Sequence, residues 1–359
     1  MIRVEQAHVQ VAAVSHAGMS GKNNEDRYAV SAYQLGPDDP TPALVAVLAD
    51  GIGGHRAGEV AAELAVETLS RSLEDSDGKK PLAELQNAVS KASQQVFAYA
   101  QSDMGRQGMG STCACAWVIG SRLYTANVGD SRIYLLRGDS IQQISKDHTW
   151  VQEALEQGVI TPEQVRGHPN QHVIRRYLGS PQPAQAGLGL YLNPGESEEQ
   201  ARANQGMRLH PDDILLVCSD GLTDLVENEE ILATLRSQPL DQAVQGLVDL
   251  ANTRGGHDNI TVIGIHIPPP PPHPVSKARR WVRSIFIGLI VLLVVVGLAA
   301  AALQFVRWRE AMQPTPTPTL TPVPVLTSTP RQLPGEATLA PTFTPTSRST
   351  STPERTSTP

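Results

Sequence analysis

Five short acidic motifs, far apart in the chain, lie at the ends of apolar, β-branched runs. The motifs are Asn24-Glu25-Asp26, Asp50-Gly51, Gly129-Asp130-Ser131-Arg132, Ser219-Asp220-Gly221 and Gly256-His257-Asp258-Asn259. The apolar runs predict buried strands, and a glycine beside an acid predicts a turn. Carboxylates held in turns at strand ends can converge in space while the strands themselves form a rigid core.

Carboxylates that converge repel one another unless cations neutralise them. Carboxylate and carbonyl oxygens suit Mg²⁺ or Mn²⁺, whereas Zn²⁺ prefers thiolate and imidazole ligands. The sequence therefore points to an oxygen-ligated hydrolytic site that holds more than one metal ion.

The motifs, in this order, resemble those of the metal-dependent Ser/Thr protein phosphatases of the PPM family (the PP2C type), in particular its bacterial branch. The resemblance runs from about Val9 to Ile267. The matching motifs are Asn-Asn-Glu-Asp at 23–26, Ala-Asp-Gly-Ile-Gly-Gly-His at 49–55, Gly-Met-Gly-Ser-Thr at 108–112, Asn-Val-Gly-Asp-Ser-Arg at 127–132, Lys-Asp-His-Thr at 146–149, Cys-Ser-Asp-Gly-Leu-Thr-Asp at 218–224 and Gly-His-Asp-Asn-Ile-Thr at 256–261. One such motif is weak because Asp-Gly is a common turn, but seven in register are specific.

The resemblance implies a role for each acidic motif. The expected ligands of two Mn²⁺ or Mg²⁺ ions are Glu25, Asp50, the Gly51 carbonyl, Asp220 and Asp258, with Asp50 shared between the ions. Asp130 and Asp220 fit a third, weaker metal site, so each domain holds two ions or three. Asp26 orients the attacking water, and Asn259 holds Asp258 in place by a hydrogen bond. Each acid taken alone is explained better as a turn or capping residue, and only the joint pattern favours the metal site.

The chain departs from the family pattern at the phosphate-binding end of the site. Gly21 stands where the family usually has an arginine that holds the substrate phosphate, and His16 stands where it usually has an aspartate. The adjacent Lys22 supplies a positive charge without the bidentate fork of an arginine, and Arg27 is the other candidate. His55 is a candidate general acid, although a metal-bound water or the solvent could serve instead.

The segment from Lys146 to Gly179, called the flap below, resembles the mobile flap that borders the metal channel in bacterial members of the family. Its polar residues are explained equally well as those of an exposed surface excursion.

Composition limits the expected partners and the cellular compartment of the protein. Aromatic residues are only 4% and the net charge is −7, and no long Lys/Arg run lies in the predicted folded part, so nucleic acid is not an expected partner. The three cysteines lie in apolar runs and are expected to be buried free thiols in a reducing compartment. The N-terminus lacks the apolar stretch of a cleavable signal peptide.

The segment Ser284–Val306 contains no charged residue over 23 positions, enough to span a hydrocarbon core of roughly 30 Å. Basic residues flank it unequally: Lys277, Arg279, Arg280 and Arg283 precede it, and Arg307 and Arg309 follow it. This asymmetry predicts a cytoplasmic N-terminal side and an extracytoplasmic C-terminal tail at the cell membrane.

Four regions are therefore expected: a phosphatase domain at 7–267, a Pro-rich and basic juxtamembrane linker at 268–283, a transmembrane helix at 284–306, and a disordered Pro/Thr/Ser-rich tail at 307–359. Apolar periodicity places strands near 9–14, 28–33, 44–49, 112–119, 122–128, 132–136, 207–209, 213–218 and 260–267. It places helices near 56–74, 82–101, 149–157, 228–237 and 241–253.

Propensity alone gives an α+β fold, and the resemblance implies a four-layer α-β-β-α sandwich.

The leading hypothesis is a membrane-tethered, cytoplasm-facing phosphatase that removes phosphate from phosphoserine and phosphothreonine in proteins. Its expected partners are phosphoproteins, including a membrane Ser/Thr kinase and the substrates of that kinase. The second hypothesis is a catalytically weak, metal-binding sensor or scaffold, which only Gly21 supports. A metal-dependent nuclease or phosphodiesterase is disfavoured by the acidic, aromatic-poor composition. The sequence leaves the oligomeric state open.

Overall fold

The computed structural model of the chain describes residues 1–53, 57–269 and 277–312, with side-chain surroundings for all of these except 277–284. His55, residues 270–276 of the predicted juxtamembrane linker and residues 313–359 of the tail lie outside the described residues. The chain divides into two units, Met1–Pro274 and Val275–Pro359, each of which is described by itself.

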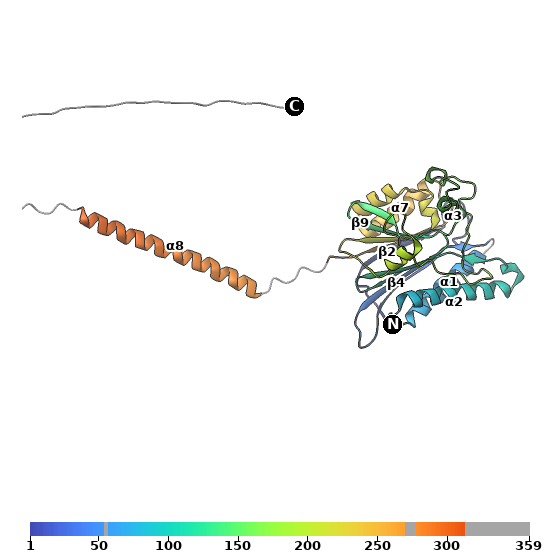
Figure 1. Cartoon of the computed structure of the whole chain (residues 1–359), viewed down its shortest axis with the longest axis horizontal. Helices are drawn as coiled ribbons and strands as arrows, with labels where there is room; N and C mark the ends of the chain where they lie inside the picture. Colours follow the sequence, from blue (N-terminus) through green and yellow to red (C-terminus); the bar gives the residue numbers. More distant parts are fainter. Residues whose placement is uncertain (54–56, 270–276, 313–359) are drawn as a thin grey trace, which may run out of the picture. The chain divides into compact units, whose positions relative to one another are not determined.

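Two antiparallel sheets form the centre of the first unit (Figure 1). The first sheet has the strand order β1 (Ile2–Val4), β3 (Arg27–Gln34), β4 (Pro42–Ala49), β7 (Cys113–Ile119), β8 (Arg122–Val128) and β11 (Met207–Arg208). The second has the order β10 (Ser140–Gln143), β9 (Arg132–Arg137), β12 (Ile214–Cys218), β13 (Ile260–His266) and β2 (Gln10–His16). A short separate pair joins β5 (Gly51–Ile52) to β6 (Gly110–Ser111).

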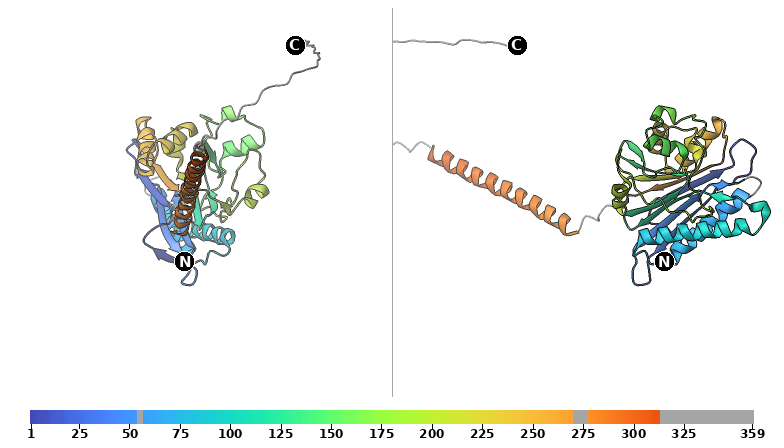
Figure 2. Two further views of the ribbon diagram at one scale, coloured as in Figure 1. Left: turned by 90° about the vertical axis from the view of Figure 1, so that its left-hand side faces the viewer. Right: turned by 45° about the vertical axis from the view of Figure 1, so that its right-hand side comes forward.

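Helices cover the outer face of each sheet, and Figure 2 shows the resulting layers. The helices α1 (Ala57–Glu74) and α2 (Pro81–Gln101) pack on the first sheet. The helices α6 (Asn228–Ser237) and α7 (Leu240–Thr253) pack on the second, together with the single turn α5 (Asp220–Thr223). The order helix, sheet, sheet, helix confirms the predicted four-layer α+β sandwich.

The alternation of side chains along β4 shows how the sequence builds these layers. Val45 and Val47 point to the core beneath α1 and α2, while Leu44, Ala46 and Leu48 point to the core between the two sheets. A strand that is buried on both faces needs a continuous apolar run, because its side chains alternate between the faces.

The strand register brings distant chain segments to one edge of the sandwich. In the first sheet Arg27 pairs with Ala49 and Leu48 pairs with Ala114. In the second sheet Cys218 pairs with both Arg132 and Val262. The start of β3, the ends of β4, β8 and β12, and the start of β13 therefore lie at the same edge, and each of them adjoins an acidic motif.

The flap contains α3 (Trp150–Glu156) and the short 3₁₀ helix η2 (Pro162–Gln164). Its last residues return to the sandwich, where Leu178 pairs with Ser111 of β6. The helix α4 (Glu198–Ala203) follows, and another 3₁₀ turn, η1 (Met104–Arg106), precedes β6.

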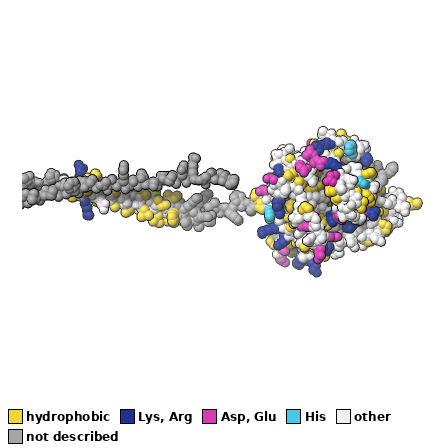
Figure 3. Space-filling view, turned by 45° about the horizontal axis from the view of Figure 1, so that its top comes forward, with side chains coloured by type: hydrophobic (Ala, Val, Ile, Leu, Met, Phe, Trp, Pro, Cys, Tyr) yellow, Lys and Arg dark blue, Asp and Glu magenta, His cyan; other side chains and the backbone are white. Residues whose placement is uncertain are grey.

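The second unit contains one long helix, α8 (Lys277–Ala311). Its segment Ile285–Ala311, 27 residues, is long and apolar enough to cross a membrane. Figure 3 shows the described part of this helix as almost entirely hydrophobic, with basic side chains near one end. The face of the first unit in the same view carries acidic and basic side chains interspersed.

Candidate metal centre

The predicted acidic residues gather at the shared edge of the two sheets. Glu25 and Asp26 precede β3, and Asp50 directly follows β4. Asp130 follows β8, Asp220 is the first residue of α5, and Asp258 lies just before β13. The five motifs, which span more than 230 positions of the sequence, are thus placed together by strand pairing within each sheet and by the packing of the two sheets on each other.

Asp26 joins the two sheets in the interior. Its side chain is 2% exposed, and its Oδ2 accepts a hydrogen bond from Ser219 Oγ at 2.8 Å. The same hydroxyl accepts from the backbone N–H of Thr261 at 2.9 Å. The second oxygen, Oδ1, is buried and has no hydrogen-bond partner among the described residues.

The main chain of Asp50 is fixed by hydrogen bonds to the Ser111-Thr112 pair. Its N–H donates to Thr112 Oγ1 at 2.9 Å, and its carbonyl accepts from Thr112 N at 2.8 Å and from Ser111 Oγ at 2.9 Å. Thr112 Oγ1 also lies 2.7 Å from Ser131 Oγ. The Gly-Ser-Thr and Asp-Ser-Arg motifs therefore hold the position of the Asp50 carboxylate.

Glycines allow two predicted ligand oxygens to approach each other. A Cβ atom on Gly58 would lie 2.8 Å from Glu25 Oε2 and 2.8 Å from the Gly51 carbonyl oxygen. Both oxygens thus converge on the same small space at the start of α1. A Cβ on Gly51 would lie 2.2 Å from the Gly58 carbonyl, so no larger residue fits there without rearrangement.

Asn259 connects Asp258 to the loop that carries Glu25. Its backbone N–H donates to Asp258 Oδ1 at 2.9 Å. Its side-chain Oδ1 accepts from the N–H of Glu25 at 2.7 Å, and its Nδ2 donates to the carbonyls of Ala17 and Asn23 at 3.1 Å each. The predicted hydrogen bond to Asp258 therefore comes from the main chain, while the side chain positions Glu25.

Burial and the charges of neighbouring acids raise the pKa values of Glu25, Asp50 and Asp130. Burial, followed by the charge of Asp258, raises the pKa of Glu25. Burial, followed by the charges of Asp26 and Asp220, raises the pKa of Asp50 well above its usual range. Burial and the charge of Asp220 do the same to the pKa of Asp130, which is 6% exposed.

This donor set fits hard divalent cations. Its members are carboxylates and one backbone carbonyl, and a buried oxygen of Asp220, Oδ1, lacks a hydrogen-bond partner among the described residues, as does Oδ1 of Asp26. Buried carboxylates whose ionised forms are destabilised by one another are stabilised as anions when a divalent cation binds between them. Mg²⁺ and Mn²⁺ prefer these oxygen ligands.

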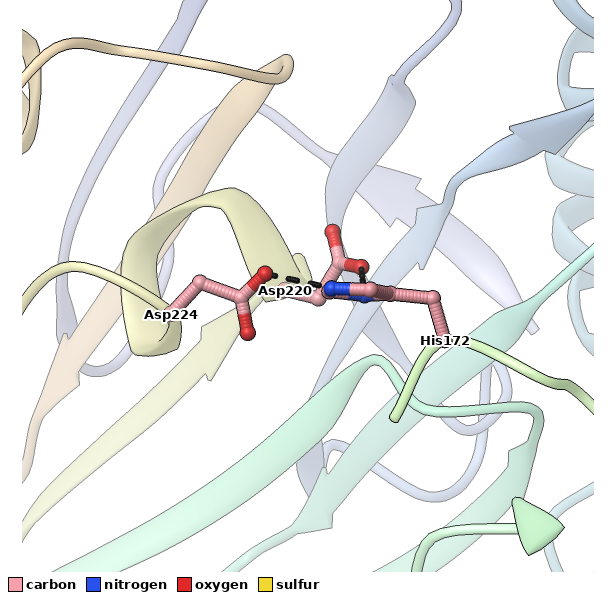
Figure 4. A group of neighbouring side chains, drawn as sticks. All are labelled: His172, Asp220 and Asp224. Atoms are coloured by element: carbon pink, nitrogen blue, oxygen red, sulfur yellow. Dashed lines mark ion pairs between the residues drawn. The ribbon is translucent and has the colours of Figure 1, made fainter. Parts of the chain in front are cut away.

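A tighter group lies at the flap side of the site, where the sequence analysis predicted Asp220 as a ligand but not His172 or Asp224. The Nδ1 atom of His172 is 3.6 Å from Asp220 Oδ2 and 3.7 Å from Asp224 Oδ2 (Figure 4). Contact with Asp220, opposed by burial and followed by the charge of Asp224, raises the pKa of His172 to about 9. Within the described chain, these three residues form a group whose geometry could hold a metal ion.

Flap residues hold the flap against α5 and the start of α6. Gln171 Nε2 donates to Asp224 Oδ1 at 3.0 Å, and Arg166 donates to the Asp224 carbonyl at 3.1 Å and pairs with Glu227. A cavity of about 480 Å³ remains between the flap and the acidic edge. Asp130, Asp220 and His172 line it, so the site is open to a ligand from this side.

The candidate cations for a substrate phosphate differ in availability. The Arg27 guanidinium donates to the carbonyls of Asn24 and Asp26 at 3.0 and 2.7 Å and pairs with Glu59, so it is already engaged. Lys22 is exposed and forms no ion pair with the described residues. Its loop lies beside the Asp258 loop, because Met19 N donates to the Gly256 carbonyl at 2.7 Å.

Comparison with known proteins agrees with this geometry. The sequence model of the family described as "Protein phosphatase 2C" matches residues 15–154. The serine/threonine phosphatase stp of Listeria innocua is 36% identical over 226 residues, which are 61% of this chain and 82% of that protein. This chain belongs to the protein phosphatase 2C family.

Mycobacterial relatives extend the comparison to solved structures. The serine/threonine protein phosphatase PstP of Mycobacterium tuberculosis is 36% identical over 255 residues, which are 71% of this chain but only 44% of PstP. A crystal structure of PstP has a TM-score of 0.62 to this chain at 33% identity and covers 73% of it and 99% of the solved chain. The PstP catalytic domain has also been solved with two manganese ions, with a TM-score of 0.59.

Proposed function

We propose that this protein hydrolyses phosphoserine and phosphothreonine in proteins with the help of Mn²⁺ or Mg²⁺. The convergence of six acids from five distant motifs, all but the exposed Asp258 buried or half-buried, is the observation that carries the proposal. Family membership and the printed activities of the relatives support it. The manganese ions in the PstP structure support the choice of metal.

We propose the ligand set that the family resemblance implies, which the convergence of these oxygens supports. Glu25, Asp50 and the Gly51 carbonyl would hold one ion, and Asp50, Asp220 and Asp258 would hold the other. Asp130 with Asp220 offers a third, weaker position. When bound, such ions lower the pKa of water toward neutrality and neutralise charge on a phosphoryl group.

The protein's own side chains hold the ligands and the attacking water in position. Ser219 holds Asp26 through Oδ2, and Oδ1 has no partner among the described residues, so we propose that it accepts a hydrogen bond from the attacking water. The Thr112 and Ser111 hydrogen bonds keep Asp50 in one position, and Asn259 does the same for Glu25. Preorganised ligands of this kind cost little reorganisation during the reaction.

Activity on a phosphothreonine peptide should require added Mn²⁺ or Mg²⁺ and disappear with EDTA. Asp50→Asn and Asp220→Asn should each lower kcat/KM at least about a hundredfold, because charge aimed at the reacting group is lost. Asp241→Asn, an exposed acid in the first turn of α7, is the matched control and should behave as wild type. Mn²⁺ binding without any hydrolysis would favour the sensor or scaffold hypothesis instead.

We propose that Lys22 supplies the charge that attracts the substrate phosphate. Gly21 has φ +74°, so an arginine placed there would be strained by its backbone conformation. Lys22 is close enough for its charge to act against the rise in the pKa of Glu25. Lys22 is exposed and forms no ion pair with the described residues, so its charge is available to an anion that binds near Glu25.

Lys22→Ala should raise KM for a phosphopeptide about five- to tenfold and change kcat less, the pattern expected of a group that binds ground and transition states alike. Lys79→Ala removes an exposed lysine from another loop and serves as the control. Unchanged KM in Lys22→Ala would assign the phosphate contact to another cation.

We propose that residues 7–267 are the phosphatase domain and that α8 anchors it to the cell membrane. The last main-chain hydrogen bonds of the sandwich are made by Ile267, with Asp212 and Asp213, so the proline run from 268 begins where strand pairing ends. Residues 268–283 would serve as the linker, 284–306 as the span and 307–359 as the tail.

The excess of basic residues before the span supports a cytoplasmic phosphatase domain. Such a position suits phosphoprotein substrates of a membrane Ser/Thr kinase.

Single cysteines at Ser276→Cys and Ser347→Cys test this topology. In intact cells a membrane-impermeant thiol reagent should label only the second variant. The three native cysteines are buried, so the wild-type protein is the unlabelled control. Labelling at position 276 alone would invert the protein and separate the domain from cytoplasmic substrates.

A further inference from the structure

A second cavity, of about 380 Å³, adjoins the metal-site cavity. Asp147 and Gln152 line both of them. The second cavity lies between the flap and the segment that follows it, and its lining includes Lys146, His148, Arg175, Arg176, Gly187 and Tyr191. None of these residues belongs to the metal-binding set, so the cavity needs an explanation of its own.

His148 meets a hydrogen-bond donor at each ring nitrogen. The backbone N–H of Gly129 is 3.2 Å from Nδ1, and Arg176 Nη1 is 3.1 Å from Nε2. Burial, followed by the charges of Arg176 and Lys146, lowers the pKa of His148 to about 3, so the ring is neutral at pH 7. A neutral imidazole has one N–H and one acceptor nitrogen, and it cannot accept from both donors.

The buried partner decides which nitrogen carries the hydrogen. Gly129 is buried, and an unpaired buried N–H is costly. Nδ1 is therefore the acceptor and Nε2 carries the hydrogen. The His148 Nε2–H and the Arg176 guanidinium then face each other as two donors, and an oxygen acceptor in the cavity would satisfy both.

Charge pairing leaves one lining cation without a carboxylate. Of the lining cations, Lys146 pairs with Glu156 at 3.0 Å and Arg175 with Glu153 at 3.2 Å. The lining acid Asp147 is already paired with Arg132, outside this lining, at 2.8 Å. Arg176 has no acidic partner among the described residues; it donates to the Gln185 carbonyl, and its Nη1 lies beside the His148 Nε2–H, which cannot accept from it. Glu198, the remaining acid of the lining, is exposed to solvent.

Gly187 keeps the edge of the His148 ring accessible. A Cβ atom at this position would lie 2.9 Å from His148 Cε1 and 3.0 Å from Nε2. Any other residue would crowd the nitrogen that faces Arg176. Glycine at position 187 therefore keeps open the space beside the His148 Nε2–H and the Arg176 guanidinium.

We propose that this cavity binds an anionic side chain of the phosphoprotein substrate, a carboxylate or a second phosphoryl group that flanks the phosphorylated residue. This inference rests on the proposed phosphatase function. Because the two cavities adjoin, a peptide whose phosphate enters the metal site can extend toward Arg176 and His148. Arg176 and His148 then determine which flanking residues are preferred, and they take no part in the hydrolysis itself.

The test compares phosphothreonine peptides that differ only in Asp or Asn, scanned over positions two to six on either side of the phosphothreonine. With Mn²⁺, the full chain should show about five- to tenfold higher kcat/KM for Asp than for Asn at one or more positions, as expected for a charge-assisted hydrogen bond. The Asp/Asn ratio should fall to about one in Arg176→Gln and remain partly in Arg176→Lys. Arg202→Gln removes an exposed arginine of α4 as the control and should keep the ratio.

The readouts separate this inference from the proposed function. No Mn²⁺-dependent hydrolysis of any peptide or of p-nitrophenyl phosphate would contradict the proposed function itself. Hydrolysis with an Asp/Asn ratio near one in wild type, or with an unchanged ratio in Arg176→Gln, would overturn the second subsite alone. Activation by added sulfate that Arg176→Gln abolishes would assign the cavity to a free anion and overturn its assignment to the substrate.

Discussion

Repulsion among carboxylates at one edge of the sandwich is the constraint on which the rest of the structure depends. Asp26, Asp50 and Asp130 are withdrawn from water and feel one another's charge and that of Asp220. Burial without compensation would favour their protonated forms, which are poor metal ligands. Hydrogen bonds nevertheless hold the acids close together: Asp50 is fixed by Ser111 and Thr112, Asp26 by Ser219, and the N–H of Glu25 by the Asn259 side chain.

Strand pairing accounts for how such an arrangement arises from distant motifs. The antiparallel register places the start of β3 next to the end of β4 and the end of β12 next to the start of β13. Each acid then needs only to occupy the first turn beyond its strand. The apolar runs form the rigid core, with aliphatic residues on both faces of β4. The turns that follow the strands carry the acids.

The sequence predicted the long elements because their periodicity extends over many residues. The helix expected at 228–237 is α6 as observed, and the strand expected at 122–128 is β8. The single turn α5 and the two-residue strands β5 and β6 were missed, because two to four residues carry no periodic signal. The contact of His172 with Asp220 and Asp224 was also missed, since it depends on how the flap folds back. The Asn259 side chain reaches Glu25, 234 positions away, for the same tertiary reason.

The most direct test of the central claim is the pH dependence of stability with and without metal. Folding raises the pKa of Asp26 to about 7 and also raises the pKa values of Asp50 and Asp130, so the folded state holds protons that the unfolded chain has released, and stability is lost as the pH rises toward 7. The free energy of unfolding of residues 1–270, measured by urea denaturation in EDTA, should therefore decrease between about pH 5 and pH 7.5. Saturating Mn²⁺ should raise it and remove the decrease. An identical pH dependence with and without Mn²⁺ would contradict the account.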